Sequence, residues 1–503
     1  MGMHDFTFYN IIKRNARACK DGIALVCGDR RVTNDGLLEL VDRLADGLVA
    51  AGLKTGDRIG VLAKNSLEFV YLYAAAAKTG ALLLPVNWRL SAEEVAFVLS
   101  DGTPSFVFVD PEFESMVDAV QGANGFPSEF FSTGAVTSSL AAFNDIFTDA
   151  RNESSADFSN RDAFVIMHTA AVQGKPRGAV LTHQGTILAA MNVMTKFRLS
   201  RTDGNIVMLP LFHSLGLVML LAASMAGGLN IVMPKFDAAV ALRHIKEDKA
   251  TMFGEFAPML GMLLDAARDA GGDLSGVRNV LGIDGPDTIE RFQETAGATF
   301  WVAYGQSETS ALCTTAPYSE RPGSAGFPLD FAEVDTVDEH GNTCRPGDSG
   351  EIVVRGPLVF KGYWNLEQET EFTFRDGRHH TGDLGRIDED GYLWFQGRAP
   401  EKELIKPGGE NVYPVEVENT ILEHPSVAAV SVIGVPDAKW GEAIKAVCVL
   451  EKGDSLDEKE LIEFVAGRIA RFKKPKHVVF VGELPLLESG GVDRDKVKAE
   501  HGG

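Results

Sequence analysis

The first stretch whose residue types suit chemistry spans residues 167–178, which carry Gly174, Lys175 and Arg177 directly after the apolar run 163–167. A strand that ends in such a loop is typical of a phosphate cradle, because backbone N–H groups converge on the anion and a cation neutralises part of its charge. The stretch is not a Walker phosphate loop, since no Gly-Lys-Ser/Thr sequence ends it. An ordinary surface loop is the alternative interpretation, and the downstream residues decide between them.

Five more motifs follow along the chain. Residues 210–213 read Pro-Leu-Phe-His, residues 304–308 read Tyr-Gly-Gln-Ser-Glu, residues 381–383 read Thr-Gly-Asp, residues 397–398 read Gly-Arg, and residues 406–414 read Lys-Pro-Gly-Gly-Glu-Asn-Val-Tyr-Pro. Their order and spacing resemble the acyl-adenylate-forming superfamily, which includes acyl-CoA synthetases, non-ribosomal peptide adenylation domains and firefly luciferase. The resemblance covers nearly the whole chain and implies that ATP, Mg²⁺ and coenzyme A serve to activate a carboxylic acid.

The resemblance assigns a set of residues to the nucleotide. These are Thr169, Gln173, Gly174, Lys175, Arg177, Gly178, Gly285, Pro286, Tyr304, Gly305, Asp383 and Arg398. Asp383 is expected to accept hydrogen bonds from both ribose hydroxyls, while Arg398 donates to the ribose. Tyr304 offers a flat face to adenine, with core packing as the alternative.

The same resemblance names four catalytic residues, Ser307, Glu308, His213 and Lys402. Joining a carboxylate to ATP brings two anions together, so the site must screen charge and stabilise the phosphorus in the transition state. Glu308 is the expected Mg²⁺ ligand, and a solvated surface acid is the alternative. Ser307 stands where the family usually has threonine. Lys402 is the expected pivot between the two domains, in a junction that carries two more residues than the usual Gly-Arg-x-Lys-Glu.

His213 is also expected at the acyl pocket, although a lone histidine is more often structural. Phe256, Ala257, Gly282 and Asp284 are the other residues expected to line this pocket. His379 and His380 lie next to Asp383, but no third spaced ligand supports a metal site, so exposed loop histidines are expected.

Coenzyme A is expected to meet the loop at residues 406–411 through Lys406, Gly408, Gly409 and Glu410. Lys473 belongs to the basic run 471–476, which is expected to bind the nucleotide phosphates of coenzyme A. A solvated charged face is an equally weighted alternative.

The chain departs from the family pattern in two places. The phosphate loop lacks hydroxyls at Ala170, Val172 and Gln173, and near the C-terminus Gly491 stands where the family has lysine. That lysine bridges the substrate carboxylate and the α-phosphate, and losing such a donor costs ~10²–10³-fold in rate, or about 3–4 kcal/mol. An altered residue, compensation by Lys496, and genuinely weak adenylation are three open explanations.

The elements that must position these residues alternate helices with apolar strands. Helices are predicted over residues 34–51 and 67–78, and strands over 59–63, 81–86 and 106–110. Ser91 and Glu94 have the spacing of a capping box at the start of a further helix. Such alternation predicts parallel sheets covered on both faces. After Arg321, short strands with glycine turns predict a small antiparallel region.

The predicted fold is therefore α/β: a large N-terminal domain of doubly wound sheets with a small antiparallel β region, hinged to a small C-terminal α/β domain. The domains are expected at residues 1–397, which hold the ATP and acyl sites, and 398–503, which are mobile. A chain of 503 residues needs at least two cores.

The net charge of −22 argues against binding to nucleic acid or anionic membranes. Five scattered cysteines indicate reduced thiols in a cytoplasmic protein. The N-terminus has no long apolar stretch, so a cleaved signal peptide is not expected. The apolar residues 217–226 predict a buried helix rather than a membrane span.

The sequence thus predicts an AMP-forming acyl-CoA ligase for an apolar fatty or aromatic acid, with a homodimer as a candidate assembly. One rival is an adenylation enzyme that loads a carrier protein, and residues 406–414 favour coenzyme A over it. The other rival is a catalytically impaired homologue that binds nucleotide or acyl-CoA. Gly491 and the altered phosphate loop support that rival, whereas Asp383 and Arg398 oppose it.

Overall fold

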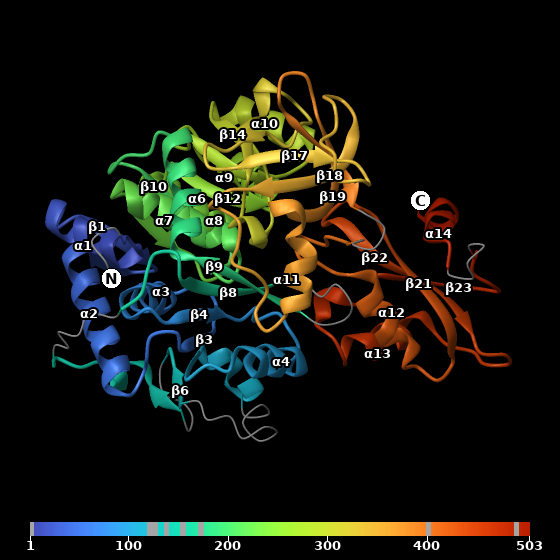
Figure 1. The fold of residues 1–503 in the computed structure, drawn as a ribbon, viewed down its shortest axis with the longest axis horizontal. Helices are drawn as coiled ribbons and strands as arrows, with labels where there is room; N and C mark the ends of the chain where they lie inside the picture. The colour runs from blue at the N-terminus through green and yellow to red at the C-terminus, as the bar shows by residue number, and fades with distance from the viewer. Residues whose placement is uncertain are drawn as a thin grey trace.

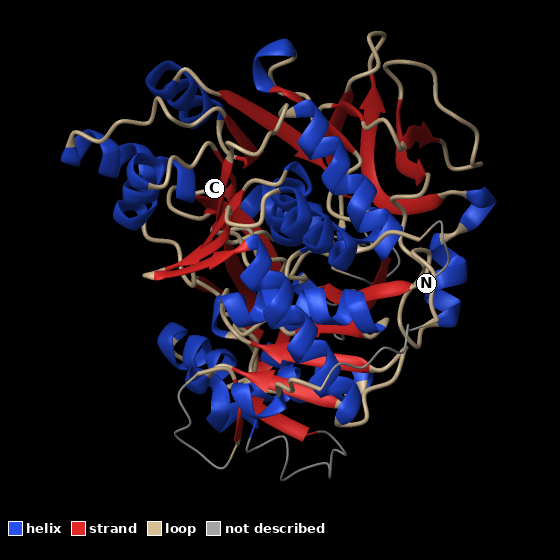
Figure 2. Cartoon of the chain, turned by 90° about the vertical axis from the view of Figure 1, so that its left-hand side faces the viewer, coloured by secondary structure: helices blue, strands red, loops and turns tan. Residues whose placement is uncertain are grey.

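A computed structural model describes residues 5–117, 129–134, 140–150, 157–169, 176–398, 404–486 and 492–502. Two large sheets and three layers of helices form the N-terminal domain (Figures 1 and 2). The expected switch to antiparallel strands follows, and a small α/β unit lies beside the large domain at the C-terminal end (Figure 1). The predicted fold class is confirmed. The predicted domain boundary at residue 397 lies one residue before the end of a strand, and it stays a prediction.

The first large sheet has seven strands in the order β7-β6-β5-β3-β4-β8-β9. All its neighbours pair in parallel except β8 and β9, which form an antiparallel hairpin. Its strands are β3 (Arg58–Leu62), β4 (Leu82–Pro85), β5 (Phe106–Val109), β6 (Glu129–Ser132), β7 (Ala141–Ala142), β8 (Ala163–Thr169) and β9 (Arg177–Thr182).

The second large sheet has nine strands in the order β16-β15-β14-β13-β12-β10-β11-β1-β2, parallel at its centre and antiparallel at both edges. Its strands are β1 (Ile23–Cys27), β2 (Arg30–Thr33), β10 (Gly204–Val207), β11 (Leu229–Val232), β12 (Met252–Phe256), β13 (Asn279–Ile283), β14 (Thr299–Tyr304), β15 (Thr314–Pro317) and β16 (Phe327–Pro328).

One layer of helices is buried between the two sheets, and its side chains share one apolar cluster with strands of both. These helices are α1 (Phe8–Ala18), α2 (Asn34–Ala50), α3 (Leu67–Thr79), α6 (His183–Lys196) and α7 (Ser214–Ala226). The outer faces are covered by α4 (Ala92–Gly102) on the first sheet and by α8 (Ala238–Glu247), α9 (Met259–Ala270) and α10 (Pro286–Ala296) on the second.

Several local predictions are confirmed. Residues 217–226 belong to the buried helix α7, and among the described residues no helix is both long and apolar enough to span a membrane. Ser91 and Glu94 form the capping box of α4, as their spacing predicts.

The smaller region starts with a four-stranded antiparallel sheet of β17 (Glu333–Val337), β18 (Ser349–Arg355), β19 (His379–Ile387) and β20 (Leu393–Arg398), with α11 (Glu367–Thr373) between β18 and β19. The C-terminal unit has its own apolar core. It contains β21 (Val427–Asp437), β22 (Gly441–Leu450), β23 (His477–Val481), α12 (Pro414–Leu422), α13 (Glu458–Ala466) and α14 (Arg494–His501).

Candidate functional site

Asp383 is the best-defined polar group among the predicted site residues. It lies on β19 and is 1% exposed. Its Oδ2 atom accepts hydrogen bonds from Tyr304 Oη and Gln306 Nε2, each at 2.7 Å. Its Oδ1 atom lies 3.5 Å from Nε of Arg398, the cross-strand partner on β20, and accepts no hydrogen bond from any described residue. One carboxylate oxygen is thus held in place while the other is left for a further donor.

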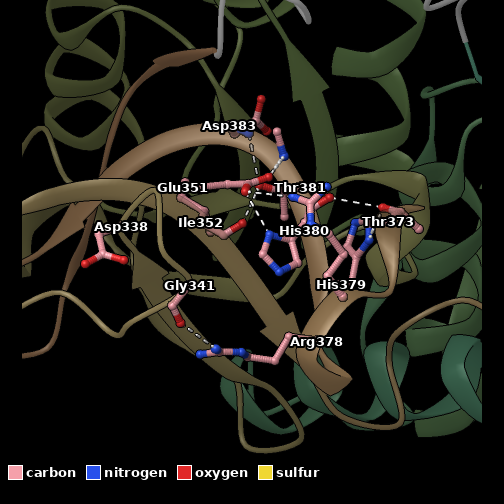
Figure 3. Close-up of polar contacts among 12 residues, drawn as sticks. Asp338, Gly341, Glu351, Ile352, Thr373, Arg378, His379, His380, Thr381 and Asp383 are labelled. Atoms are coloured by element: carbon pink, nitrogen blue, oxygen red, sulfur yellow. Dashed lines mark hydrogen bonds and ion pairs between the residues drawn. The ribbon is translucent and has the colours of Figure 1, made fainter. Parts of the chain in front are cut away.

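A buried polar network holds the strand behind Asp383 (Figure 3). The Glu351 carboxylate lies 2.8 Å from His380 Nδ1 and accepts the Gly382 N–H at 2.9 Å. His379 Nε2 lies 3.3 Å from Gln306 Oε1, so this histidine helps to orient the amide that donates to Asp383. The prediction of exposed loop histidines is wrong. His379 and His380 are 1% and 5% exposed, because they lie within a strand that is covered on both faces.

Tyr304 ends β14 and packs in a small apolar cluster, so its core-packing role is real. Burial raises the pKa of its phenol well above the ordinary value, and the charge of Asp383 adds to the rise. The phenol therefore stays protonated and donates to Asp383. The Phe395 ring lies 6.0 Å from the Tyr304 ring, and Gly305 follows directly in the chain.

Glu308 lies in the short 3₁₀ turn Ser307–Thr309 and is 8% exposed, which excludes a solvated surface acid. Its Oε1 atom accepts a hydrogen bond from Tyr363 Oη at 2.8 Å. The Arg177 guanidinium lies 5.5 Å from the centre of the Tyr363 ring. A buried carboxylate near a phosphate-loop cation fits a Mg²⁺ ligand. Among the described residues no cluster of three or more acidic, histidine or cysteine side chains is placed to hold a metal ion.

The predicted phosphate loop connects the two strands of the β8–β9 hairpin. Thr169 pairs with Arg177 across it, and the Thr169 hydroxyl donates to the Arg177 carbonyl at 3.3 Å. Gly178 follows Arg177 on β9. Other predicted residues lie outside the described ranges, namely Gln173, Gly174 and Lys175 of this loop, Lys402 of the junction, and Gly491.

The expected acyl-pocket residues meet at the ends of β12 and β13. Phe256 ends β12, Ala257 follows it, and a Cβ atom on Gly282 would lie 2.2 Å from Glu255 Oε1. Asp284 accepts the Gly285 N–H at 2.7 Å. Gly285 caps α10, and Pro286 is the first residue of that helix.

Glu255 is fully buried and its carboxylate accepts no hydrogen bond from the described residues. Burial raises its pKa well above the ordinary value of 4.5, and the charge of Asp284 adds to the rise. The backbone N–H groups of Leu260 and Ile283 oppose the shift without well-directed hydrogen bonds. Because folding raises the pKa of the Glu255 carboxyl group, the free energy of unfolding is higher below the pKa of this group in the unfolded chain and falls as the pH rises above it.

A Glu255→Met variant is therefore expected to be more stable than the unchanged chain at neutral pH, by roughly 1–3 kcal/mol. The difference should grow as the pH rises from 5 to 8. Over this range the unfolded chain ionises Glu255 freely, whereas the folded chain must keep its buried carboxyl group protonated, and methionine carries no such cost. Thermal unfolding midpoints of both chains over this range measure it. Equal midpoints at every pH would contradict a raised pKa.

Glu410 of the C-terminal unit reaches into the large domain. Its carboxylate lies 3.2 Å from Arg89 Nη1 and 3.7 Å from His213 Nε2, and it accepts from Asn87 Nδ2 at 3.3 Å. Burial alone would raise the pKa of Glu410. The hydrogen bond and charge of His213, together with the charge of Arg89, outweigh burial and lower it. The predicted acyl-site histidine and the predicted coenzyme A loop are therefore in contact.

A cavity of about 70 Å³ lies at this contact and is here called the interdomain cavity. Residues from both domains line it: Pro85, Asn87, Leu90, Val98, His168, Thr169, Pro176, Phe212, His213, Ser307, Glu410, Asn411, Phe472 and Lys473. It joins predicted nucleotide, acyl and coenzyme A residues in one space. At its edge, a Cβ atom on Gly409, where φ is +85°, would lie 3.2 Å from Phe256 Cβ. A side chain there would push the loop away from the acyl residues.

Lys473 is 2% exposed and ion-paired, whereas the sequence left open an exposed basic face. It contacts Glu94 of the large domain and lies 2.6 Å from Glu416 of α12. The charges of Glu416 and Glu94 outweigh the effect of burial and raise the pKa of Lys473. These three residues are called the interdomain ion cluster. Because both partners occupy its ammonium group, Lys473 is poorly placed to bind the phosphates of coenzyme A.

Lys406 and Gly408 of the loop at residues 406–411 do not line the interdomain cavity. Lys406 is exposed and its backbone N–H donates to Glu442 at 2.6 Å. Gly408 packs against Trp440, since a Cβ atom there would lie 2.8 Å from its ring.

Sequence reasoning missed Gln306, Tyr363, Arg89 and Glu94 as partners of the site. Gln306 stood at the variable position of a quoted motif, and Glu94 was recognised only as a helix cap. No sequence signal pointed to Tyr363 or Arg89, because their roles depend on neighbours that are far away in the chain.

Comparison with known proteins agrees with this geometry. The AMP-binding enzyme family matches residues 12–364, and the AMP-binding enzyme C-terminal domain matches residues 416–490. Indoleacetate–CoA ligase of Aromatoleum aromaticum is 36% identical over 488 residues, which cover 93% of each chain.

Among solved structures, a double mutant of o-succinylbenzoate CoA synthetase from Bacillus subtilis, bound to its product analogue, is 29% identical with a TM-score of 0.86, covering 97% of this chain and 98% of that one. The complex of the same synthetase with its acyl-adenylate intermediate is 28% identical with a TM-score of 0.71, covering 99% of each chain. Two family matches that together span most of the chain, and a relative more than 30% identical over nearly its whole length, show that the protein belongs to the AMP-binding enzyme family, the acyl-adenylate-forming superfamily.

Proposed function

We infer that the protein is an AMP-forming acid–thiol ligase that joins a carboxylic acid to coenzyme A. The interdomain cavity is the observation that supports this most strongly, because it places Thr169, Ser307 and His213 opposite Glu410 and Asn411. A thiol that enters between the domains would meet an acyl group held beside the nucleotide.

In the first step, the acid carboxylate attacks the α-phosphorus of ATP and pyrophosphate leaves. Asp383 and Arg398 hold the ribose, while Ser307 supplies a hydroxyl donor toward the phosphates. Glu308 would hold Mg²⁺, which neutralises phosphate charge when it is bound. In the second step, the thiol sulfur attacks the acyl carbon and AMP leaves.

The arrangement of the two domains supports the second step. The chain matches the product-analogue complex of o-succinylbenzoate CoA synthetase at a TM-score of 0.86, against 0.71 for its acyl-adenylate complex. The docked loop with Glu410 and the interdomain ion cluster hold this arrangement. Thioester formation is therefore the step for which the described conformation is organised.

A second pocket, of about 470 Å³, adjoins the interdomain cavity and shares Leu90 and Phe472 with it. Arg89 and Arg471 line this pocket, and the Arg89 guanidinium lies 4.3 Å from the centre of the Trp88 ring. Two arginines beside an aromatic ring suit a nucleotide with several phosphates. Arg471 rather than Lys473 is the residue of the basic run that we assign to coenzyme A.

The substrate is inferred to be an aromatic or fatty acid. Phe256 and Ala257 are apolar wall residues of the expected acyl pocket, and the name of the Aromatoleum relative specifies indoleacetate. A cytoplasmic location and a homodimer remain predictions from the sequence.

The test is pyrophosphate release and thioester formation with ATP, Mg²⁺ and a panel of indoleacetate, ferulate, benzoate and decanoate, with and without coenzyme A. Acid-dependent pyrophosphate release and a coenzyme A thioester are expected for at least one acid. Glycine at position 491 replaces the family lysine that assists adenylation. Synthetic acyl-adenylates are therefore supplied in parallel, so that the second step is tested by itself. If neither pyrophosphate nor thioester forms with any acid or any acyl-adenylate, a binding protein without activity is favoured.

A further inference from the structure

His168 and Asp101 form a buried histidine–carboxylate pair that the steps above do not use. Asp101 lies in the last turn of α4, and His168 is the penultimate residue of β8. His168 Nε2 lies 2.9 Å from Asp101 Oδ2, and only 5% of the histidine side chain is exposed. His168 Nδ1 has no hydrogen-bond partner among the described residues. If Nε2–H donates to Asp101, Nδ1 is a bare acceptor.

The His168 ring lines the interdomain cavity together with Thr169, Ser307 and His213. A coenzyme A thiol that passes between the domains reaches the acyl carbon through this space. The thiol must lose its proton to attack, because a free thiol has a pKa of about 8.5 and is mostly protonated at pH 7. A buried acceptor atom on this path therefore has a chemical use.

The other titratable groups of the cavity are committed elsewhere. The Lys473 ammonium pairs with two carboxylates and has no lone pair to offer. The lowered pKa of Glu410 makes it a weak base, and its carboxylate already contacts Arg89. His213 shares that carboxylate, and its side chain is 36% exposed.

The cations packed around the pair have other partners. Arg177 faces the Tyr363 ring from β9, and Arg58 of β3 donates to the backbone oxygens of Gly102 and Thr103. Among the described residues, Asp101 is the only carboxylate bonded to His168. The pair therefore has the arrangement of a general base with a carboxylate that orients it.

We propose that His168, oriented by Asp101, accepts the proton of the coenzyme A thiol during thioester formation. The proposal rests on the proposed function. The S–H proton moves to His168 Nδ1 while sulfur bonds to the acyl carbon, the bond between that carbon and the phosphate oxygen breaks, and AMP leaves with the electron pair. Asp101 stabilises the resulting imidazolium, which then releases its proton to solvent.

The test uses single-turnover thioester formation from synthetic indoleacetyl-, feruloyl- or decanoyl-adenylate, whichever the unchanged chain converts fastest, between pH 6 and 9. His168→Gln keeps a side-chain N–H that can donate to Asp101 but has no basic nitrogen. It is expected to be slower by about 10²-fold at pH 7, the lower end of the range for a general base. The gap should close above the thiol pKa, where thiolate forms without a base.

Two further variants separate a base from an anchor. His168→Ala should regain rate with added imidazole in proportion to its free-base form. Asp101→Asn should move the pH dependence of the rate, because the imidazolium loses its counter-charge. His183→Gln is the control. His183 is also buried, and burial lowers its pKa to about 3, so neither rate nor pH dependence should change.

A loss for His168→Gln that is equal at every pH, without imidazole rescue, would reduce His168 to an anchor between β8 and α4 and overturn the proposal. Imidazole rescue of a His213→Ala variant alone would move the base to His213 and overturn it as well. If the unchanged chain converts no acid of the panel and no acyl-adenylate, the proposed function itself fails and the proposal fails with it.

Discussion

Replacing Gly491 with lysine is expected to speed acyl-adenylate formation by about 10²–10³-fold. The superfamily that this chain belongs to places a lysine at this position, and glycine offers no cation to bridge the carboxylate and the α-phosphate. The measurement is the initial rate of pyrophosphate release with ATP, Mg²⁺ and the acid panel. Thioester formation from a supplied acyl-adenylate should change much less, because that step has no phosphorus attack to assist.

Gly490→Lys provides a matched control for this variant, since it adds the same charge one residue earlier. It should stay near the rate of the unchanged chain, because a one-residue shift moves the ammonium group away from the reacting atoms. Equal rates for the unchanged chain and Gly491→Lys would mean that another cation already serves. Lys496 would then be the next residue to replace, although it is 63% exposed and pairs with Asp493 at 2.9 Å.

The interdomain ion cluster should show the second large effect. Lys473→Met leaves Glu94 and Glu416 without their shared cation, and removing one partner of a buried pair costs about 3–5 kcal/mol. The docked arrangement of the domains should lose population, so thioester formation from acyl-adenylate should slow. The rate of that half-reaction and the radius of gyration from small-angle scattering measure the two consequences.

Glu94→Gln separates docking from the stability of the C-terminal unit. Glutamine keeps the α4 capping box but removes the charge that faces Lys473, whereas Glu416→Gln acts within the C-terminal unit. Glu94→Gln should slow thioester formation with little change in the unfolding midpoint of that unit. If Glu94→Gln changes neither the rate nor the radius of gyration, the cluster does not hold the domains together.

The fold class and most large elements were predictable because their signals are local. Alternating apolar strands and helices and the capping box at Ser91 each depend on a few neighbouring residues. The predicted helix over residues 34–51 is α2 (Asn34–Ala50), and the predicted strand over 59–63 is β3 (Arg58–Leu62). The antiparallel pairing of β8 with β9 was not predicted, since the sequence of two strands joined by a loop does not show whether the strands pair with each other.

The sequence identified site residues by motif but not their partners. Asp383 was expected to bind ribose, yet its hydrogen bonds from Tyr304 and Gln306 depend on how β14 and β19 meet in space. The role of Lys473 stayed open in the sequence, because its partner Glu94 lies 379 positions earlier in the chain. His168 had no sequence signal at all, since an apolar run that ends in histidine does not reveal a carboxylate on a helix 67 positions earlier in the chain.

Glu94 also links the helix cap to the closed arrangement of the domains. Its Oε2 atom accepts the Ser91 N–H at 2.7 Å and the Ala470 N–H at 3.2 Å, while Oε1 faces Lys473. The Ser91 bond lies within the capping box of α4, whereas the Ala470 bond joins the C-terminal unit to the large domain. Hydrogen–deuterium exchange at Ala470 should therefore rise each time the two domains separate, while Ser91 stays protected by its own helix cap and serves as the internal reference.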